Sequence, residues 1–325
     1  MADPRVAVYI DFDNVVISRY DQVHAGRRDP WRADGARDHA PDETSSNPVA
    51  VRLAEAMVDI GAVLDYASSF GTVALARAYA DWSVPANAAY RRQLVDRAVD
   101  LTQLFPVSGT KNGADIRLSI DAMEDLVHHE DLTHVVIVGG DSDYIALAQR
   151  TKQWGRFVVG IGVTGSTSRA LVAACDEFSS YDALPGVREP GPVATRAVEP
   201  DPPAEQASTK QTAPAKKAAS AKKTSARKTA RKATSPTKAP EDPEVARQRE
   251  ATELLVRALQ IAADRGDDDE WFFGGGVKSQ MQRMDPGFKE KSLGFKTFSA
   301  FIASCPDLVE TRGDGGDLQV RLVSR

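Results

Sequence analysis

The stretch Val6-Ala-Val-Tyr-Ile-Asp-Phe-Asp-Asn14 decides the fold, together with a second stretch, Val135-Val-Ile-Val-Gly-Gly-Asp-Ser-Asp143. Each is a short run of mainly β-branched residues that stops abruptly in acidic residues. Continuous apolar runs of this length, bounded by turn formers, are typical of strands buried in a parallel sheet. Since ligands bind outside the carboxyl ends of such strands, both runs are expected to bring carboxylates to the same sheet edge.

Five aspartates are candidates for a site at that edge. Asp11 and Asp13 end the first run, Asp141 and Asp143 end the second, and Asp115 lies in the first turn of a predicted helix. Packed together, these groups would repel one another, and a bound cation is the usual remedy. Oxygen-rich clusters suit Mg²⁺ or Mn²⁺ and indicate a metal-dependent phosphodiesterase. The alternative is that each aspartate only caps a helix or ends a strand.

The rest of the chain alternates between strand and helix patterns, which predicts βαβ units and a mainly parallel sheet between two helical layers. Further strands are expected at Thr72–Tyr79, Phe105–Val107, Val135–Val138 and Arg156–Ile161, with Glu177–Tyr181 closing one edge. Helices are expected at Val49–Ile60, Asn87–Leu104, Ile116–His129, Tyr144–Trp154 and Ser166–Cys175.

Residues Ser18 to Pro48 show little periodicity and predict a long flexible loop beside the site. Long loops in such a place often contact substrate. A variable surface insertion explains the same residues equally well. The candidates for substrate contact are Arg19, Arg27, Arg28, Arg32 and Arg37.

Composition bounds the class of protein. A length of 325 residues suits two domains. The two cysteines, Cys175 and Cys305, give neither a disulfide framework nor a zinc module. No apolar run approaches the ~20 residues of a membrane span, and the N-terminus lacks a signal-peptide pattern, so we expect a cytoplasmic protein without membrane contact.

A strongly basic segment lies between the two expected domains. Ten Lys and Arg residues, and no Asp or Glu, lie between Lys210 and Lys238; removing these ten charges from the net −5 leaves −15 on the rest. From Pro185 to Pro243 apolar residues nearly vanish, which predicts a disordered linker. A basic arm of this kind binds phosphates without reading sequence, so a polyanion is the expected partner.

Residues 244–325 are again patterned for folding. Helices are expected at Glu250–Ala263, Val277–Met284 and about Leu293–Ser304. A β-hairpin signal follows between Leu308 and Val323, with Gly-Asp-Gly-Gly at its turn. Three helices and a hairpin predict a small winged-helix domain.

The first 184 residues resemble the NYN domain family. Asp11-Phe-Asp-Asn14 is similar to the family's Asp-x-x-Asn opening, and Gly140-Asp-Ser-Asp-Tyr144 to its Gly-Asp-Ser-Asp-Phe signature. Lys111-Asn-Gly-Ala-Asp115 with Asp121 resembles its Lys-x-x-x-Asp-x₅-Asp segment. Ser168-Arg-Ala-Leu and Asp176-Glu-Phe178 resemble its closing stretch, with Cys175 where Ala is common.

This resemblance implies a three-layer PIN-like nuclease fold, Mg²⁺ or Mn²⁺ dependence and action on RNA. It implies that Asn14 orients the metal or a phosphate and that Lys111 contacts the scissile phosphate. For Lys111, an exposed lysine in a loop without a role in binding is an equally good interpretation. Asp13 is a further metal candidate at a variable position of the family. Asp121 is another, but lies about 120° around the helix from Asp115. The implied catalytic metal ligands are Asp11, Asp115, Asp141 and Asp143.

The C-terminal residues resemble the LOTUS domain, also called OST-HTH, which often accompanies NYN domains. The resemblance is carried by Gly287-Phe-Lys, Leu293-Gly-Phe-Lys-Thr-Phe298, Phe301 and the hairpin. It implies RNA or protein binding, and solvated surface charge is the alternative for each lysine. The candidate phosphate contacts are Lys289, Lys291 and Lys296.

One further motif indicates a different function. Gly160-Ile-Gly-Val-Thr-Gly165 satisfies the dinucleotide-binding fingerprint between a strand and a helix. That fingerprint belongs on the first βα turn, and here it lies in the last βα unit. We therefore interpret these glycines as turn formers near the acidic edge.

The sequence thus predicts a metal-dependent endoribonuclease with domains at 1–184 and 244–325 and a linker at 185–243. In the predicted reaction, metal-activated water attacks the phosphate at the Asp cluster, while the linker and winged helix hold RNA. An RNA-binding regulator whose nuclease-like domain is catalytically weak or inactive is the alternative from another class. DNA as the substrate is a third possibility, because the 2′-hydroxyl contacts that select RNA are not readable from sequence.

Overall fold

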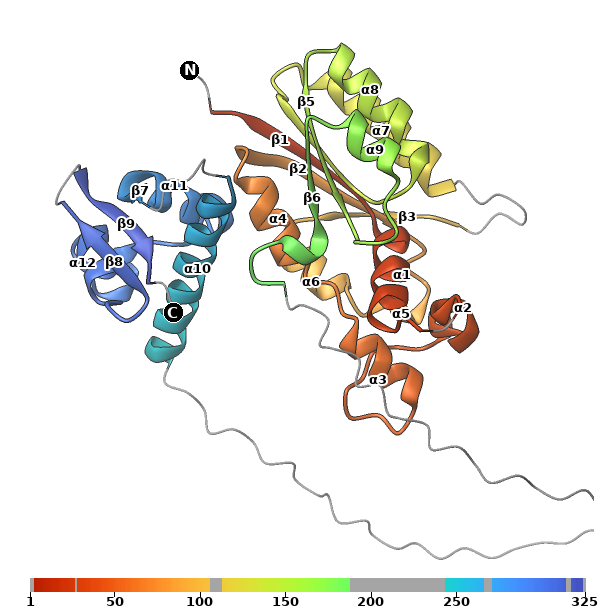
Figure 1. Ribbon diagram of the computed structural model, residues 1–325, viewed down its shortest axis with the longest axis horizontal. Coiled ribbons are helices and arrows are strands. Elements are labelled where there is room, and N and C mark those ends of the chain that lie inside the picture. The colour runs from red at the N-terminus through yellow and green to blue at the C-terminus, as the bar shows by residue number, and fades with distance from the viewer. Residues whose placement is uncertain are drawn as a thin grey trace, which may run out of the picture.

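A computed structural model of the chain describes residues 3–26, 28–105, 113–187, 243–265, 271–313 and 317–323. The described residues before 188 form a mixed α/β unit around one sheet, and those after 242 form a smaller unit around another (Figure 1). The expected linker lies almost entirely outside the described residues.

The large sheet has six parallel strands in the order β3-β2-β1-β4-β5-β6. The predicted mainly parallel sheet is therefore confirmed. The chain fills one half of the sheet with β1 to β3 and the other half with β4 to β6, so its winding reverses between β1 and β4. Their bounds are Arg5–Asp11 for β1, Thr72–Ala80 for β2, Asp100–Gln103 for β3, His134–Val138 for β4, Phe157–Gly162 for β5 and Glu177–Ser180 for β6.

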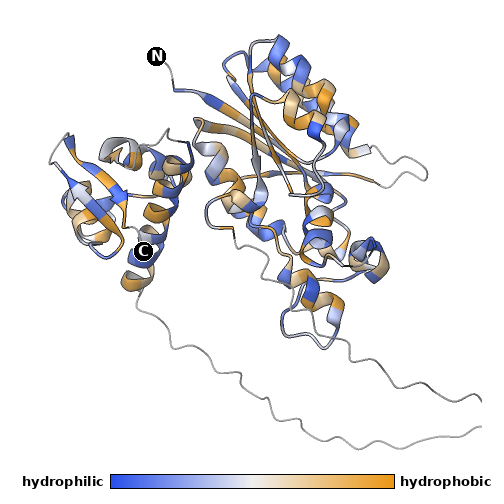
Figure 2. Ribbon diagram, viewed as in Figure 1, coloured by the Kyte–Doolittle hydropathy of each residue, from blue (hydrophilic) through white to orange (hydrophobic). Residues whose placement is uncertain are grey.

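Helices cover both faces of this sheet (Figure 1). Alternate side chains of β1 belong to the cores of opposite layers. Val6, Val8 and Ile10 pack against α1 (Phe12–Val23), α4 (Ile60–Ser68) and α6 (Arg91–Asp96). Ala7 and Tyr9 pack in the layer of α7 (Gly113–His128), α8 (Ile145–Gln153) and α9 (Arg169–Ala174). This is the expected three-layer arrangement, and Figure 2 shows that the helices of both layers carry hydrophobic as well as hydrophilic residues.

Residues 18–48 are not the flexible loop that we expected. Helix α1 continues to Val23, and α2 (Pro30–Asp34) and the 3₁₀ turn η1 (Ala36–Asp38) follow. The buried Tyr20 anchors this segment, because its hydroxyl donates to Asp34 at 2.7 Å and its ring meets Trp31 edge-on. Tertiary contacts therefore order a stretch whose local pattern is weak.

Two helix predictions were wrong in their boundaries. The expected helix Val49–Ile60 is α3 (Pro48–Glu55), and a new helix, α4, begins at Ile60 after the Asp59 cap. The Asp59 carboxylate accepts from the Ala62 N–H at 3.1 Å, so Gly61 lies inside α4 and does not end a helix.

The expected helix Asn87–Leu104 was also wrong. It is split into α5 (Pro85–Ala88), α6 and the strand β3, and Ala98, with a left-handed φ of 53°, separates α6 from β3. The strand that we placed at 105–107 is therefore earlier in the chain. Phe105 is not in a strand, and residues 106–107 lie outside the described residues.

The C-terminal unit contains the predicted helices and hairpin. Helix α10 (Pro243–Arg265) packs with α11 (Gly274–Met284), and α12 (Phe298–Ala303) follows the 3₁₀ turn η4 (Glu290–Leu293). Strands β8 (Val309–Arg312) and β9 (Gln319–Leu322) form the antiparallel hairpin. We did not foresee β7 (Phe272–Phe273), which pairs with β9 and makes the sheet three-stranded.

Among the described residues, no helix is both long and apolar enough to serve as a membrane span.

Candidate active site

Three carboxylates converge at the carboxyl edge of the large sheet. Asp115, Asp141 and Asp143 each offer one oxygen atom, and these atoms all lie within 4.8 Å of one another. Burial, followed by the negative charges of Asp141 and Asp143, raises the pKa of Asp115 above its ordinary value. The group is therefore electrostatically unfavourable when all three members are ionised, as expected of a cation site.

The turn after β4 places Asp141 and Asp143. Asp141 caps the 3₁₀ turn η2 (Ser142–Tyr144), since its carboxylate accepts from the Asp143 N–H at 3.2 Å. The two preceding glycines lie in tight packing: a Cβ atom on Gly140 would lie 3.0 Å from the Ser166 carbonyl oxygen, and one on Gly139 would lie 3.3 Å from the Cβ of Asp11. The Gly-Gly-Asp-Ser-Asp order thus lets the β4 turn approach its neighbours.

Asp11 lies behind this group and is almost fully buried, with 4% of its surface exposed. It ends β1 and caps α1, because its Oδ1 accepts from the Asn14 N–H at 3.2 Å. Burial raises the pKa of Asp11 to about 7, and the charges of Asp115 and Asp13 act in the same direction. Hydrogen bonds from Tyr144 and Asn14 offset only part of this rise.

Tyr144 connects Asp11 to the exposed group, and sequence reasoning missed its role. Its buried hydroxyl donates to Asp11 Oδ2 at 2.7 Å and also interacts with Asp115. Burial and the two nearby carboxylates raise the pKa of Tyr144, so the hydroxyl keeps its proton and acts as a donor. The signal was present in the sequence, because a tyrosine stands here where the resembled motif has phenylalanine.

Asn14 links α1 to the turn after β4. Its side-chain Oδ1 accepts from the Gly140 N–H at 3.0 Å. The oxygen is thus used within the protein, and the amide NH₂ is the part that could contact a ligand.

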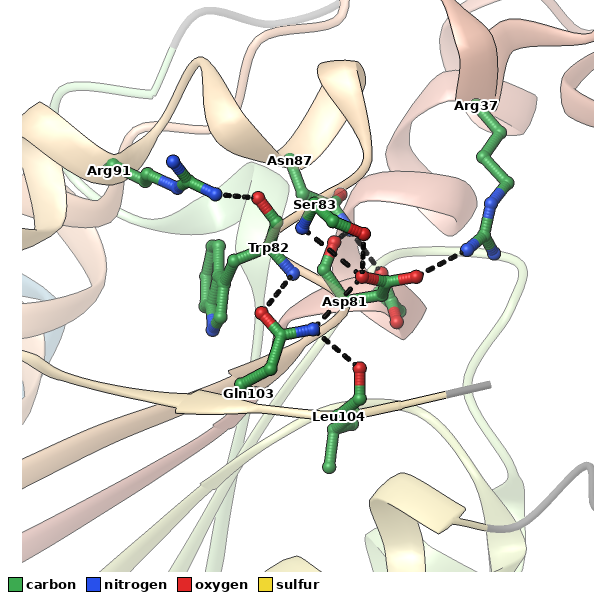
Figure 3. A network of polar contacts seen from close by, with 9 residues as sticks. Arg37, Asp81, Trp82, Ser83, Asn87, Arg91, Gln103 and Leu104 are labelled. Carbon is green, nitrogen blue, oxygen red and sulfur yellow. Dashed lines mark hydrogen bonds and ion pairs between the residues drawn. The ribbon is translucent and has the colours of Figure 1, made fainter. Parts of the chain in front are cut away.

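Asp13 belongs to a different polar network. Asn87 donates to Asp13 Oδ1 at 2.6 Å and to the Asp81 carbonyl oxygen at 3.1 Å. The Asp81 carboxylate accepts from Arg37 at 2.7 Å and from Gln103 at 3.0 Å (Figure 3). This network joins the ends of β1, β2 and β3, and it places Asp13 outside the group of three carboxylates.

The structure also places Asp121 outside that group. Asp121 is buried against the sheet, where its carboxylate accepts from Arg117 at 2.8 Å and from the Tyr79 hydroxyl at 3.1 Å. The Tyr79 contact joins α7 to β2, and Arg117 lies one turn earlier on α7 itself. The helical phase between Asp115 and Asp121 accounts for this separation.

The predicted basic contacts have different positions. Lys111 lies outside the described residues. The three lysines predicted in the C-terminal unit are exposed around η4 and the loop after it: Lys289, Lys291 and Lys296.

The glycines of the dinucleotide-like motif mainly serve packing. Gly160 and Gly162 lie inside β5, and a Cβ atom on Gly160 would lie 2.4 Å from the Phe178 ring. Only Gly165, with a φ of 87°, forms the turn that we expected. The motif is thus largely part of the contact between β5 and the segment that follows it.

The parallel sheet, its two helical layers and the acidic edge at the reversal of winding define an α/β domain of the PIN-like class. The chain belongs to the NYN domain family, whose family model matches residues 5–182. Residues 246–320 match the OST-HTH/LOTUS domain. Both resemblances seen in the sequence are therefore confirmed.

Two further comparisons add little to this assignment. The crystal structure of a protein of unknown function from Vibrio parahaemolyticus is similar to this chain, with 19% identity and a TM-score of 0.40. The match covers 55% of this chain and 93% of that one. No curated protein matches the chain.

Proposed function

We propose that the chain is a metal-dependent endoribonuclease that cleaves RNA at the carboxyl edge of its large sheet. The NYN domain suggests a PIN-like nuclease, and the LOTUS domain suggests association with RNA. The observation that carries the proposal is the convergence of Asp115, Asp141 and Asp143 within 4.8 Å. Asp11, which shares the Tyr144 hydroxyl with Asp115, is the fourth carboxylate of the proposed site.

The donor set fits a hard divalent cation. The group of three consists of carboxylates alone, and oxygen ligands favour Mg²⁺ or Mn²⁺ over the metals that prefer imidazole or thiolate. Such an ion would also relieve the repulsion that contributes to the raised pKa of Asp115. The proposed ligands are Asp115, Asp141, Asp143 and Asp11.

The protein's own groups have separate tasks in this proposal. When bound, the ion would supply charge stabilisation at the phosphate and promote deprotonation of the attacking water. Tyr144 donates to Asp11 and so holds that carboxylate in one orientation. The Asn14 amide NH₂ and Lys111 are the proposed donors to phosphate oxygens.

RNA binding is proposed for the remainder of the chain. We assign nuclease, linker and winged-helix domains to residues 1–184, 185–243 and 244–325. The linker contributes ten cations between Lys210 and Lys238, and the C-terminal unit adds its exposed lysines, Lys289, Lys291 and Lys296. Deleting 210–238 is expected to weaken RNA binding and to flatten its dependence on salt, because fewer counterions are then released.

The decisive experiment is cleavage of end-labelled single-stranded RNA and DNA with and without Mn²⁺. Wild-type protein and the exposed-site control Asp131→Asn should cleave RNA only with the ion, and Asp141→Asn should lose that activity. Metal-independent cleavage, or full activity in Asp141→Asn, would refute the assignment. RNA binding without cleavage by the wild type would instead favour the regulatory alternative, and preferential cleavage of DNA would change the substrate.

A further inference from the structure

The C-terminal unit lies against the end of α4, and its contacts there are polar and specific (Figure 1). The Arg283 Nε donates to the Ser68 carbonyl oxygen at 2.8 Å, and Arg265 donates to the Ser69 carbonyl oxygen. The Gln280 amide donates to Ser68 Oγ at 3.1 Å. Carbonyl groups at a helix C-terminus carry partial negative charge, so two guanidinium groups are well suited to this place.

A buried carboxylate strengthens the same contact. Asp65 in α4 is only 1% exposed, and it pairs with Arg97 from its own domain. Its second oxygen lies 2.9 Å from Arg257 Nη1, which α10 of the C-terminal unit supplies. Nearby, the Arg265 guanidinium lies over the Phe70 ring at 3.9 Å from the centroid. Undocking would remove one of the two guanidinium groups that face this buried carboxylate and leave Arg97 as its remaining partner, so Asp65 favours the docked unit.

We propose that the end of α4, with Asp65, Ser68, Ser69 and Phe70, is a docking surface for the winged-helix unit of the same chain. The two units then form one body, although 55 residues outside the described ranges separate them in sequence. Docking uses α10 and α11, and it leaves the exposed lysines around η4 free to contact a partner.

Docking also fixes where these lysines lie relative to the carboxylates, an inference that rests on the proposed function. Helix α4 ends just before Thr72, so the docked unit lies at the amino edge of the sheet, opposite the acidic edge. Lys289 and Arg97 line one hollow of about 280 Å³ between the units. The nine residues of β2 at ~3.3 Å each separate the two edges by roughly 30 Å.

For a stacked strand, this separation sets the length of RNA that contacts both places. At the ~3.4 Å rise of a stacked strand, roughly 30 Å corresponds to about eight to nine nucleotides. Shorter RNA would contact the carboxylate edge or the lysines, whereas longer RNA could contact both. The affinity of the full chain should therefore rise steeply near this length.

Small-angle X-ray scattering of the full chain tests docking without reference to activity. The wild type should scatter as a monomer with the units in contact. The double variant Gln280→Ala/Arg283→Ala should show a larger radius of gyration at the same mass. Lys278→Ala is the matched control, because Lys278 lies on the same helix but pairs with Glu290 inside its own unit at 2.8 Å. Circular dichroism checks that each variant is folded, and Arg265→Ala replaces the double variant if that one unfolds.

Several results would overturn the docking surface. One is a wild-type scattering profile of two bodies that move independently on a tether. Others are an unchanged scattering profile in the folded double variant, or a dimer whose two chains exchange their C-terminal units. In parallel, the affinity for single-stranded RNA is measured with strands shorter and longer than about eight nucleotides. The affinity of the wild type should rise steeply near this length, and that of the double variant should not. If docking holds but this rise is absent, the two-site RNA path is wrong. If docking and binding hold but RNA is not cleaved, only the proposed nuclease activity fails.

Discussion

The substitution Asp11→Asn should stabilise the metal-free protein at neutral pH, although it removes a proposed metal ligand. Burial raises the pKa of Asp11 from 3.8 to about 7 in the folded protein. Between these pH values the folded protein holds a proton that the unfolded chain has released, so stability falls as pH rises through this window. The cost is about 4 kcal/mol once the pH exceeds 7, at 1.36 kcal/mol for each pH unit.

The assay is urea unfolding in excess chelator at several pH values between 4 and 8. Asp11→Asn should gain up to about 4 kcal/mol at pH 8 and nothing near pH 4, since asparagine is neutral throughout. Asp81→Asn is the control of opposite sign. Burial alone would raise the pKa of Asp81, but hydrogen bonds from Ser83 and Gln103 lower it overall, so this variant should lose stability at pH 8. A loss of stability in Asp11→Asn at pH 8 would refute the reasoning.

Two other substitutions test the packing around the site. Tyr144→Phe removes only the hydroxyl that donates to Asp11; at about 1.5–3 kcal/mol for such a bond, RNA cleavage should fall tenfold or more while the fold is kept. Unchanged cleavage across a Mn²⁺ titration would contradict this role. Gly160→Ala should destabilise by about 1–3 kcal/mol, because its Cβ would meet the Phe178 ring at 2.4 Å. Gly275→Ala, which meets no atom within 4 Å, should stay within about 1 kcal/mol of wild type by thermal unfolding.

The parts of the fold that follow from local pattern were predictable. The β-branched runs ending at Asp11 and before Asp141 identify buried parallel strands, because their period and boundaries are set by neighbouring residues. The same logic placed α7, α8 and the C-terminal hairpin. The convergence of Asp115 with Asp141 and Asp143 also follows, since parallel strands end at one edge.

Features that depend on distant contacts were not predictable. Tyr20 orders residues 18–48 through Asp34 and Trp31, and no local periodicity reports such contacts. Asp13 meets Asn87, 74 positions away, so its place outside the carboxylate group could not be read from the motif. Within the expected helix Asn87–Leu104, α6 is separated from β3 by Ala98, which has a left-handed φ. Glycine is the usual residue at such positions, so an alanine gives no warning of the break.

Direct measurement of Mn²⁺ binding tests the central claim, that the acidic edge holds a divalent cation. Titration of the metal-free chain, followed by calorimetry or by the loss of the free-ion electron paramagnetic resonance signal, gives the affinity without any assumption about substrate. Wild type and Asp131→Asn should bind alike, and Asp141→Asn and Asp143→Asn should each bind at least tenfold more weakly. Equal binding by all four proteins, or no binding by the wild type, would contradict the assignment.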